Sequence, residues 1–183
     1  MNFIETRFAE TEFADADDLI EYDIDGCDLG KVLVARSGTG VCAILLGANQ
    51  DEVERSLAAS FPRSTLVPNK SRIRDDLATV VQFVASPKDD LDLKLDVRGT
   101  PFQHRVWDAL RTVRSGRPVT YAQLACRVRG PKSLRAIAQA CSENPIALAI
   151  PCHRVMGNSG STAGYRWGVE RKWALVNREL AAA

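Results

Sequence analysis

The sequence predicts an α+β protein in two parts, a small antiparallel sheet with helices followed by a mostly helical part. Short runs rich in β-branched residues, separated by glycine-containing turns, fill the first part. In the second part, apolar residues recur at helical spacing in segments that follow helix-capping residues. The charge also changes sign near Arg98 and Gly99. We therefore expect an N-terminal domain of residues 1–97 and a C-terminal domain of residues 98–183.

The expected elements of the first part are three short strands, two helices and one further strand. The strands cover residues 19–24, 31–36 and 41–46, and the segment SGTG at residues 37–40 is typical of a hairpin turn. A helix is expected over residues 51–61 and another over residues 73–85, where apolar residues recur at helical spacing. The alternating segment LDLKLDV at residues 91–97 predicts the last strand.

The second part begins with a helix that Thr100 caps and Pro101 opens. A short helix follows, with Thr120 as its cap, and then a Gly130-Pro131 break and a second short helix over residues 133–141. Two short helices across a tight turn are typical of a helix-turn-helix, but also of helical hairpins in cores. An amphipathic helix from about Val169 closes the chain.

Composition narrows the class of protein. The chain has 183 residues and 45% hydrophobic residues, which is ordinary for a globular protein. Its start lacks the pattern of a signal peptide and no apolar run approaches the roughly 20 residues of a membrane span, so we expect a cytosolic protein that binds no membrane. The five cysteines are scattered and the histidines number two, which favours neither a disulfide framework nor a metal site.

The two parts carry opposite charge. Residues 1–97 hold 10 Lys and Arg against 19 Asp and Glu, a net charge of −9, and residues 98–183 hold 14 against 4, a net charge of +10. A basic surface of this size favours a polyanion such as DNA, because its cations release condensed counterions. The alternative is that the two halves attract each other.

The segment AIPCHRV at residues 149–155 places Cys152 beside His153, directly after an apolar run. Such a cysteine is usually a small buried hydrophobe. It becomes a nucleophile when a base or a helix N-terminus lowers the pKa of the thiol. The next segment, GNSGSTAGYRWG, sets Tyr165, Arg166 and Trp167 between glycines, which suits a pocket for a flat ligand or a plain connection.

Five motifs, in order, resemble the O6-alkylguanine-DNA alkyltransferases (methylated-DNA–protein-cysteine methyltransferases), in particular the C-terminal half of the adaptive-response protein Ada. They are RGTPFQHRVWDAL, TYAQLA, PKSLRAIAQACSENPIAL, IPCHRV and GYRWGVERK. The resemblance implies a ribonuclease H-like sheet in the first domain and a DNA-binding helix-turn-helix in the second. It implies a monomer that acts on double-stranded DNA containing O6-alkylguanine and needs no cofactor. A separate phosphotriester-sensing domain, as in full Ada, is not expected.

The implied activity is direct DNA repair by a single, irreversible transfer of the alkyl group to Cys152, with the guanine nucleotide flipped out of the duplex. In this reading His153 deprotonates the thiol through water and is oriented by Glu179. Tyr121 donates to the base, and Asn144 shapes the site at a hinge. Arg135 enters the duplex as a finger. The other DNA-binding residues implied are Thr120, Ser133, Ala136 and Gln139, and those of the substrate pocket are Pro151, Val155, Gly164, Tyr165, Arg166 and Trp167.

Three other functions compete with repair. A lesion-binding protein that does not react would keep the helix-turn-helix, but Cys152 argues against it. A transcriptional regulator resembling full Ada would need activation by self-methylation. A thiol hydrolase would use Cys152 and His153, but it would leave the basic half and the helix-turn-helix unexplained.

Overall fold

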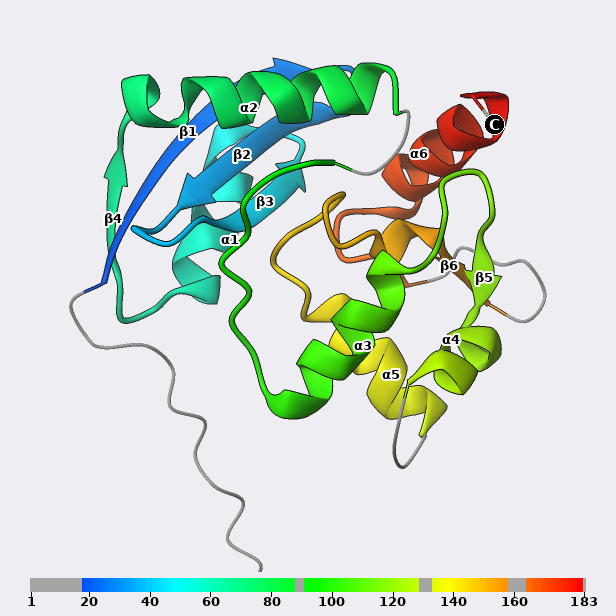
Figure 1. The fold of residues 1–183 in the computed structure, drawn as a ribbon. Coiled ribbons are helices and arrows are strands. Elements are labelled where there is room, and N and C mark those ends of the chain that lie inside the picture. Colours follow the sequence, from blue (N-terminus) through cyan, green and yellow to red (C-terminus); the bar gives the residue numbers. More distant parts are fainter. Residues whose placement is uncertain (1–17, 88–90, 129–132, 158–163, 183) are drawn as a thin grey trace, which may run out of the picture.

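The computed structural model of the chain describes residues 18–87, 91–128, 133–157 and 164–182. These residues form a mixed α+β fold in which the sheet and its helices lie beside a mostly helical part (Figure 1). The α+β prediction is therefore confirmed. The described elements run in this order: β1 (Leu19–Cys27), β2 (Gly30–Arg36), β3 (Val41–Gly47), α1 (Gln50–Ser60), β4 (Thr65–Pro68), α2 (Lys70–Ala85), α3 (Pro101–Arg111), β5 (Val119–Thr120), α4 (Tyr121–Arg127), α5 (Leu134–Ser142), the 3₁₀ turn η1 (Cys152–Arg154), β6 (Val155–Met156) and α6 (Val169–Ala182).

The main sheet has four strands in the order β3-β2-β1-β4. The β1–β2 and β2–β3 pairs are antiparallel, whereas β1 and β4 are parallel. The prediction of an antiparallel sheet is thus wrong in one respect, because the sheet is mixed. The chain leaves β3, passes through α1 and returns along the far edge, which aligns β4 with β1. The sequence did not indicate β4, since four mostly exposed residues carry no apolar alternation.

The predicted strand over residues 91–97 is also wrong. It forms one isolated bridge, in which Leu95 pairs with Val41. Two backbone hydrogen bonds hold it there, from Val41 N to Lys94 O and from Asp96 N to Val41 O, each 2.8 Å long. Gly40 permits this approach, because a Cβ there would lie 2.5 Å from the carbonyl oxygen of Lys94. The alternating pattern of residues 91–97 arises because alternate side chains are half-buried against the edge of β3, and not because the segment pairs as a strand.

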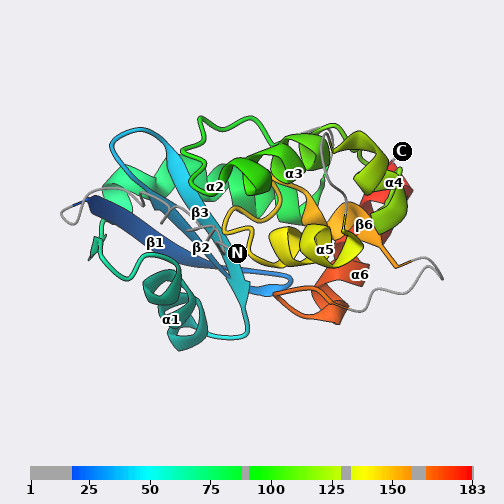
Figure 2. The ribbon, with the colours of Figure 1, turned by 90° about the horizontal axis from the view of Figure 1, so that it is seen from below.

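Two helices cover the sheet, and both begin at asparagine caps. Asn49 accepts from Glu52 N at the start of α1, and Asn69 accepts from Arg72 N at the start of α2. Helix α2 packs on β1 and β2, and α1 packs on β2 and β3 from the opposite face (Figures 1 and 2). Both helices start slightly earlier than predicted. Because α1 and α2 cover opposite faces of the sheet, β2 and β3 are buried along most of their length.

The second half is built from capped helices. Thr100 and Gln103 form a capping box at the start of α3, and Thr120 and Gln123 form another at the start of α4. Helix α5 packs against α3 and α4 (Figure 2). The predicted Gly130-Pro131 break lies outside the described residues. Each helix predicted in this half is present, including α6 from Val169.

The short strands β5 and β6 bring the start of α4 to the end of η1. They pair in parallel, with Val119 opposite Val155 and Thr120 opposite Met156. Tyr121 follows β5 directly and Cys152 begins the turn before β6, so this pairing sets the tyrosine beside the cysteine segment.

One hydrophobic cluster runs through both halves of the described chain, from Ile20 in β1 to Leu175 in α6. The edge of β3 contributes to this continuity, because Ile44 exchanges backbone hydrogen bonds with Pro145 and Ala147, each 3.0 Å long. The segment that leads to Cys152 is therefore attached to the sheet. No helix among the described residues is long and apolar enough to cross a membrane.

Candidate active site

Cys152, His153 and Arg154 form a 3₁₀ turn that is almost wholly buried. The chain reaches it through a tight bend in which Ile150 N donates to Ile146 O at 3.1 Å and Leu148 has a φ of 70°. A leucine in this left-handed region is uncommon and costs free energy that packing must offset. The turn sets the directions of the Cys152 and His153 side chains.

Asn144 forms hydrogen bonds with Cys152 and with the backbone that precedes it. Its Nδ2 donates to Cys152 Sγ at 3.3 Å and to the carbonyl oxygen of Ile150 at 2.9 Å. Its Oδ1 accepts from Ile146 N at 2.9 Å. Asn144 is fully buried, so these contacts satisfy an amide that water does not reach. The one side chain therefore fixes both the thiol and the bend that presents it.

The thiol of Cys152 is 4% exposed, and burial raises its pKa to about 11. The hydrogen bond from Asn144 and the positive charge of Lys172 act in the other direction and lower this pKa. A buried thiol with a polar donor and a cation beside it is not a plain hydrophobe. It reacts at neutral pH if a base takes its proton.

His153, the next residue in the chain, is the base predicted from the sequence. Its Nε2 lies 2.8 Å from Glu179 Oε1, and a carboxylate can only accept, so Nε2 carries the proton. The other nitrogen, Nδ1, is buried and has no hydrogen-bond partner among the described residues. Burial lowers the pKa of His153 below its usual value, despite the opposing influence of Glu179. At neutral pH the ring is therefore neutral, with Nδ1 free to accept.

Glu179 on α6 also accepts hydrogen bonds from Arg154, a residue to which the sequence interpretation gave no role. Arg154 Nε and Nη2 each donate to this carboxylate at 3.0 Å, and its Nη1 donates to Val113 O at 2.6 Å. Burial would raise the pKa of Glu179, but hydrogen bonds and charges from His153 and Arg154 outweigh it and hold the pKa low. Arg154 lies within the motif IPCHRV, but the sequence does not show that its side chain is buried.

Lys172 is the second residue that the sequence interpretation missed. Its side chain is fully buried, and no hydrogen bond to Nζ is formed within the described parts of the chain. Burial lowers its pKa, and Nζ lies 5.9 Å from the centre of the Tyr165 ring. The motif GYRWGVERK contains it, but a lysine on an amphipathic helix normally indicates the exposed face.

Aromatic side chains form the rest of the site. Tyr165 and Trp167 pack edge to face with ring centres 5.2 Å apart, and the Tyr165 hydroxyl and Trp167 Nε1 are buried without a partner within the described chain. Burial, followed by the nearby thiols of Cys141 and Cys152, raises the pKa of Tyr121 to about 12. Tyr121 is therefore a proton donor and not an anion at neutral pH. Cys141, whose role the sequence left open, is also buried.

The other predicted pocket residues take different positions. Pro151 and Val155 are buried and flank η1, where the Pro151 carbonyl oxygen accepts from Arg154 N at 3.0 Å. Gly164 has a φ of 85°, which favours glycine. Arg166 has an exposed side chain that lies over the Trp167 ring.

The predicted DNA-binding residues lie at the ends and outer surface of α4 and α5. Arg135 is exposed, and Ser133 caps α5 by accepting from Ala136 N. The Thr120 hydroxyl caps α4, and Gln139 Nε2 donates to Glu143 Oε1 at 2.9 Å. Within the described parts of the chain, the guanidinium of Arg135 has no hydrogen bond, unlike the polar groups of Ser133, Thr120 and Gln139. In the described residues, no group of three or more His, Cys, Asp or Glu side chains could hold a metal ion.

Comparison with known proteins agrees with this geometry. Residues 101–181 match the model of the family described as 6-O-methylguanine DNA methyltransferase, DNA binding domain. A methylated-DNA–protein-cysteine methyltransferase of Kluyveromyces lactis is 32% identical, over 89% of this chain and 98% of its own length. The bifunctional transcriptional activator/DNA repair enzyme Ada of Escherichia coli is 42% identical over 87% of this chain, which spans 45% of its length.

Solved structures show the same fold. The crystal structure of the Mycobacterium tuberculosis O6-methylguanine methyltransferase is similar with a TM-score of 0.75 and 30% identity, over 90% of this chain and 94% of that one. The structure of a Mycobacterium tuberculosis protein in complex with DNA gives a TM-score of 0.74 and 29% identity, over 89% and 94% of the two chains.

Proposed function

The chain belongs to the O6-methylguanine-DNA methyltransferase family, and from this we propose that it repairs DNA by taking the alkyl group of O6-alkylguanine onto Cys152. The acceptor is not regenerated, so each molecule acts once. The contact that carries the proposal is the hydrogen bond from Asn144 to Cys152 Sγ, next to a histidine whose Nδ1 is free to accept.

The reaction begins with the removal of the thiol proton. His153 Nδ1 takes it, through a bridging water, while Nε2 keeps its proton and donates to Glu179. The negative charge of Glu179 stabilises the imidazolium that forms. Lys172 and the amide of Asn144 stabilise the thiolate, because both favour the charged sulfur.

The thiolate then displaces guanine from the alkyl carbon. The carbon–sulfur bond forms as the bond between carbon and O6 breaks, and the electron pair of that bond passes to the purine. Tyr121 donates a proton to the base as this charge develops, and burial keeps it protonated for that step. The imidazolium restores the tyrosine proton. The net result is a thioether on Cys152 and an intact guanine, with the proton moved from sulfur to the base.

Tyr165, Trp167 and the backbone of Gly164 and Arg166 form the wall against which the flipped base lies. The two buried aromatic polar groups, the Tyr165 hydroxyl and Trp167 Nε1, are available to hydrogen-bond a purine edge. A base within a duplex cannot be attacked in line at its O6 substituent. It must leave the stack, which costs about a few kcal/mol.

Helices α4 and α5 constitute a helix-turn-helix in this proposal, with α5 as the recognition helix in double-stranded DNA. Arg135, at its exposed start, enters the duplex and occupies the space of the flipped nucleotide. Thr120, Ser133, Ala136 and Gln139 then lie along the nucleic acid. Residues 1–97 act as a supporting ribonuclease H-like domain and residues 98–183 carry both DNA binding and transfer, within a monomer.

Mass spectrometry of the intact protein after incubation with a duplex containing one O6-methylguanine tests the proposal. We expect a gain of one methyl group per molecule, located on Cys152. Cys152→Ala should bind the duplex and gain nothing, and Cys126→Ala, which removes an exposed thiol, should react like the unaltered protein. A protein that binds the lesion without adduct formation on Cys152 would establish the lesion-binding alternative instead.

A further inference from the structure

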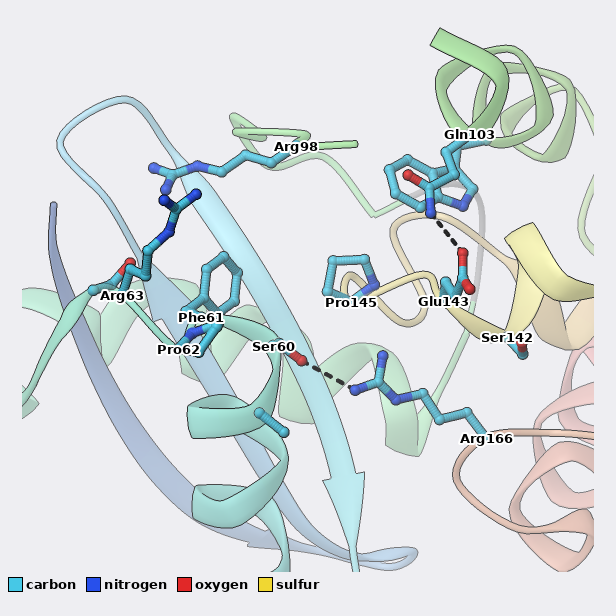
Figure 3. A pocket seen from close by; sticks show the side chains of 13 residues that line it. Ser60, Phe61, Pro62, Arg63, Arg98, Gln103, Ser142, Glu143, Pro145 and Arg166 are labelled. Atoms are coloured by element: carbon cyan, nitrogen blue, oxygen red, sulfur yellow. Dashed lines mark hydrogen bonds between the residues drawn. The ribbon is translucent and has the colours of Figure 1, made fainter. Parts of the chain in front are cut away.

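Besides the proposed substrate pocket, the structure has a pocket between the end of α1 and the start of α3 (Figure 3). Its volume is about 690 Å³, within the range of small-molecule sites, and Cys152, His153 and Tyr121 are not among its lining residues. The pocket joins the first half of the chain to the second. Of its lining residues, Arg166 alone also has a place in the proposed alkyl transfer, through its backbone.

One end of this pocket is cationic. Figure 3 shows the guanidinium groups of Arg63 and Arg98 pointing toward one another above the Phe61 ring. Ion pairs with Asp18 and Asp96 hold Arg98 in place, and its Cζ lies 5.9 Å from the centre of the Phe61 ring. These two carboxylates offset the Arg98 charge.

Arg63 differs from Arg98 because it has no ion pair or hydrogen bond to its side chain among the described residues. Asp18 and Asp96 already offset the charge of Arg98, so the exposed Arg63 guanidinium supplies the uncompensated positive charge at this end of the pocket. A pair of guanidinium groups, one fixed and one free to adjust, suits the several oxygens of a phosphate.

The other end of the pocket is polar and acidic. Gln103 Nε2 donates to Glu143 Oε2 at 2.7 Å, and Gln139 occupies the other carboxylate oxygen. A carboxylate has about four acceptor positions, so Glu143 can accept further hydrogen bonds. Between the two ends, Phe61 and Pro145 present apolar surface to the cavity (Figure 3).

We propose that this pocket binds a nucleoside monophosphate whose base carries an amino group. The phosphate lies between Arg63 and Arg98, the base lies along Phe61 and Pro145, and its amino group donates to Glu143. A phosphate alone would leave the apolar middle and the acidic end unused, and an uncharged base would leave Arg63 unpaired. The pocket therefore selects a molecule with an anion at one end and a donor at the other.

Arg166 connects this pocket to the acceptor site. Its Nη2 donates to Ser60 Oγ at 3.0 Å on the pocket wall, and its positive charge lowers the pKa of Cys152. A bound nucleotide therefore lies beside a residue that also acts on the thiol. Binding itself is independent of alkyl transfer, so it can be tested on the unreacted protein.

The test is a titration of the ¹⁵N-labelled protein with deoxyadenosine 5′-monophosphate, followed by backbone amide chemical shifts. We expect saturable shifts at Ser60, Phe61, Arg63 and Ser64. Arg63→Gln should weaken binding about tenfold or more, because a charge-assisted contact is lost. Arg74→Gln, which alters an exposed arginine on α2, should bind like the unaltered protein.

Two further ligands test separately what each end of the pocket contributes to binding. Deoxyadenosine, which lacks the phosphate, should bind about as weakly to the unaltered protein as the monophosphate binds to Arg63→Gln. Deoxyinosine 5′-monophosphate, in which an oxygen replaces the amino group, should bind more weakly than the adenosine compound, and Glu143→Gln should remove that preference. Absence of saturable shifts at residues 60–64, shifts confined to residues 164–168, or equal losses in Arg63→Gln and Arg74→Gln would overturn the proposal.

Discussion

Among the single residues of the acceptor site, Glu179 joins two side chains of the turn that contains Cys152. It accepts from His153 and from Arg154, and all three side chains are at most 2% exposed. The buried carboxylate keeps Nε2 of the histidine protonated and balances the arginine charge. One residue therefore supports both the proposed base and the stability of the turn.

Glu179→Gln should slow alkyl transfer strongly and lower the free energy of unfolding by about 3–5 kcal/mol, because Arg154 is left buried without its counter-ion. The pKa of Glu179 is low in the folded protein, so the stability that its charge contributes is present above the ordinary carboxyl pKa. It is lost as the pH falls through the lower, folded value. Urea unfolding at several pH values, together with single-turnover transfer rates, measures both effects.

Glu170→Gln provides the control, since this carboxylate lies exposed in the first turn of the same helix. It should leave the transfer rate and the acid dependence of stability nearly unchanged. A Glu179→Gln protein as stable and as fast as the control would show that the buried carboxylate has neither role.

Lys172 acts on the thiol through charge and not through contact. Burial lowers its own pKa, and its positive form lowers the pKa of Cys152. The two groups therefore favour each other's charged states, which suits a site that must form a thiolate. This residue, unlike Glu179, has no hydrogen bond to the turn among the described residues.

Lys172→Met should raise the pKa of Cys152 above its value of about 11, because burial remains while the nearby positive charge is lost. At any pH below that pKa, less thiolate is present, so alkylation of Cys152 by iodoacetamide should slow. The rate-against-pH curve should move to higher pH. Lys70→Met, at an exposed position of α2, should give the original curve, and an unmoved curve for Lys172→Met would contradict the electrostatic role.

At the scale of elements, α3 begins at a cap predicted from the sequence and contacts the helix that leads to the active site. Its start is held by the reciprocal bonds of Thr100 and Gln103. Further along, Trp107 Nε1 donates to the carbonyl oxygen of Ala140 in α5 at 2.9 Å. Helix α5 leads within a few residues to Asn144, which holds the thiol. The cap therefore stabilises a helix that positions α5 and the segment that contains Asn144.

Thr100→Ala should lower the free energy of unfolding by about 1 kcal/mol, since one hydroxyl acceptor of the first turn is lost. Thr79→Ala is the matched control, because Thr79 is exposed within α2 and bonds only to Asp75 O there. Its change should stay within about 0.5 kcal/mol. Urea denaturation of the two variants decides this, and equal changes would contradict a capping contribution from Thr100.

Elements with a local signal were predictable, and elements defined by pairing were not. The caps at Thr100 and Thr120 depend on residues three positions away, so the sequence contains the whole motif. The strand β4 and the lone bridge of Leu95 depend instead on where distant strands lie. Alternation at residues 91–97 indicates half-burial in either case, and it cannot distinguish a strand from an edge contact.

At the scale of the whole molecule, the opposite charges of the two halves do not separate them. Backbone contacts join the edge of β3 to residues 94–96 and 145–147, and one apolar cluster includes both halves. From α6, Arg171 Nε donates to Leu29 O and Arg178 Nη1 donates to Val84 O. The halves should therefore unfold together.

Leu33→Ala tests this cooperativity from the sheet. Leu33 is fully buried in β2, so the change should cost about 2–5 kcal/mol. All three tryptophans lie in residues 98–183, so their fluorescence reports the second half, while far-ultraviolet circular dichroism reports both. We expect both signals to give one urea midpoint that moves down together. Leu19→Ala, half-exposed in β1, should move it little, and a fluorescence midpoint unaffected by Leu33→Ala would show that the halves unfold independently.

The sequence by itself determined the α+β class and the helices with caps, because those signals are local. Its ordered set of motifs predicted the thiol, base and carboxylate of the proposed transfer. The tertiary structure decided that His153 and Glu179, 26 residues apart, meet at 2.8 Å, and that Arg154 and Lys172 are buried beside them. It also placed Arg63 opposite Arg98 in a second pocket (Figure 3). Burial and long-range contact depend on how elements pack, and a charged residue in a sequence shows neither until its neighbours surround it.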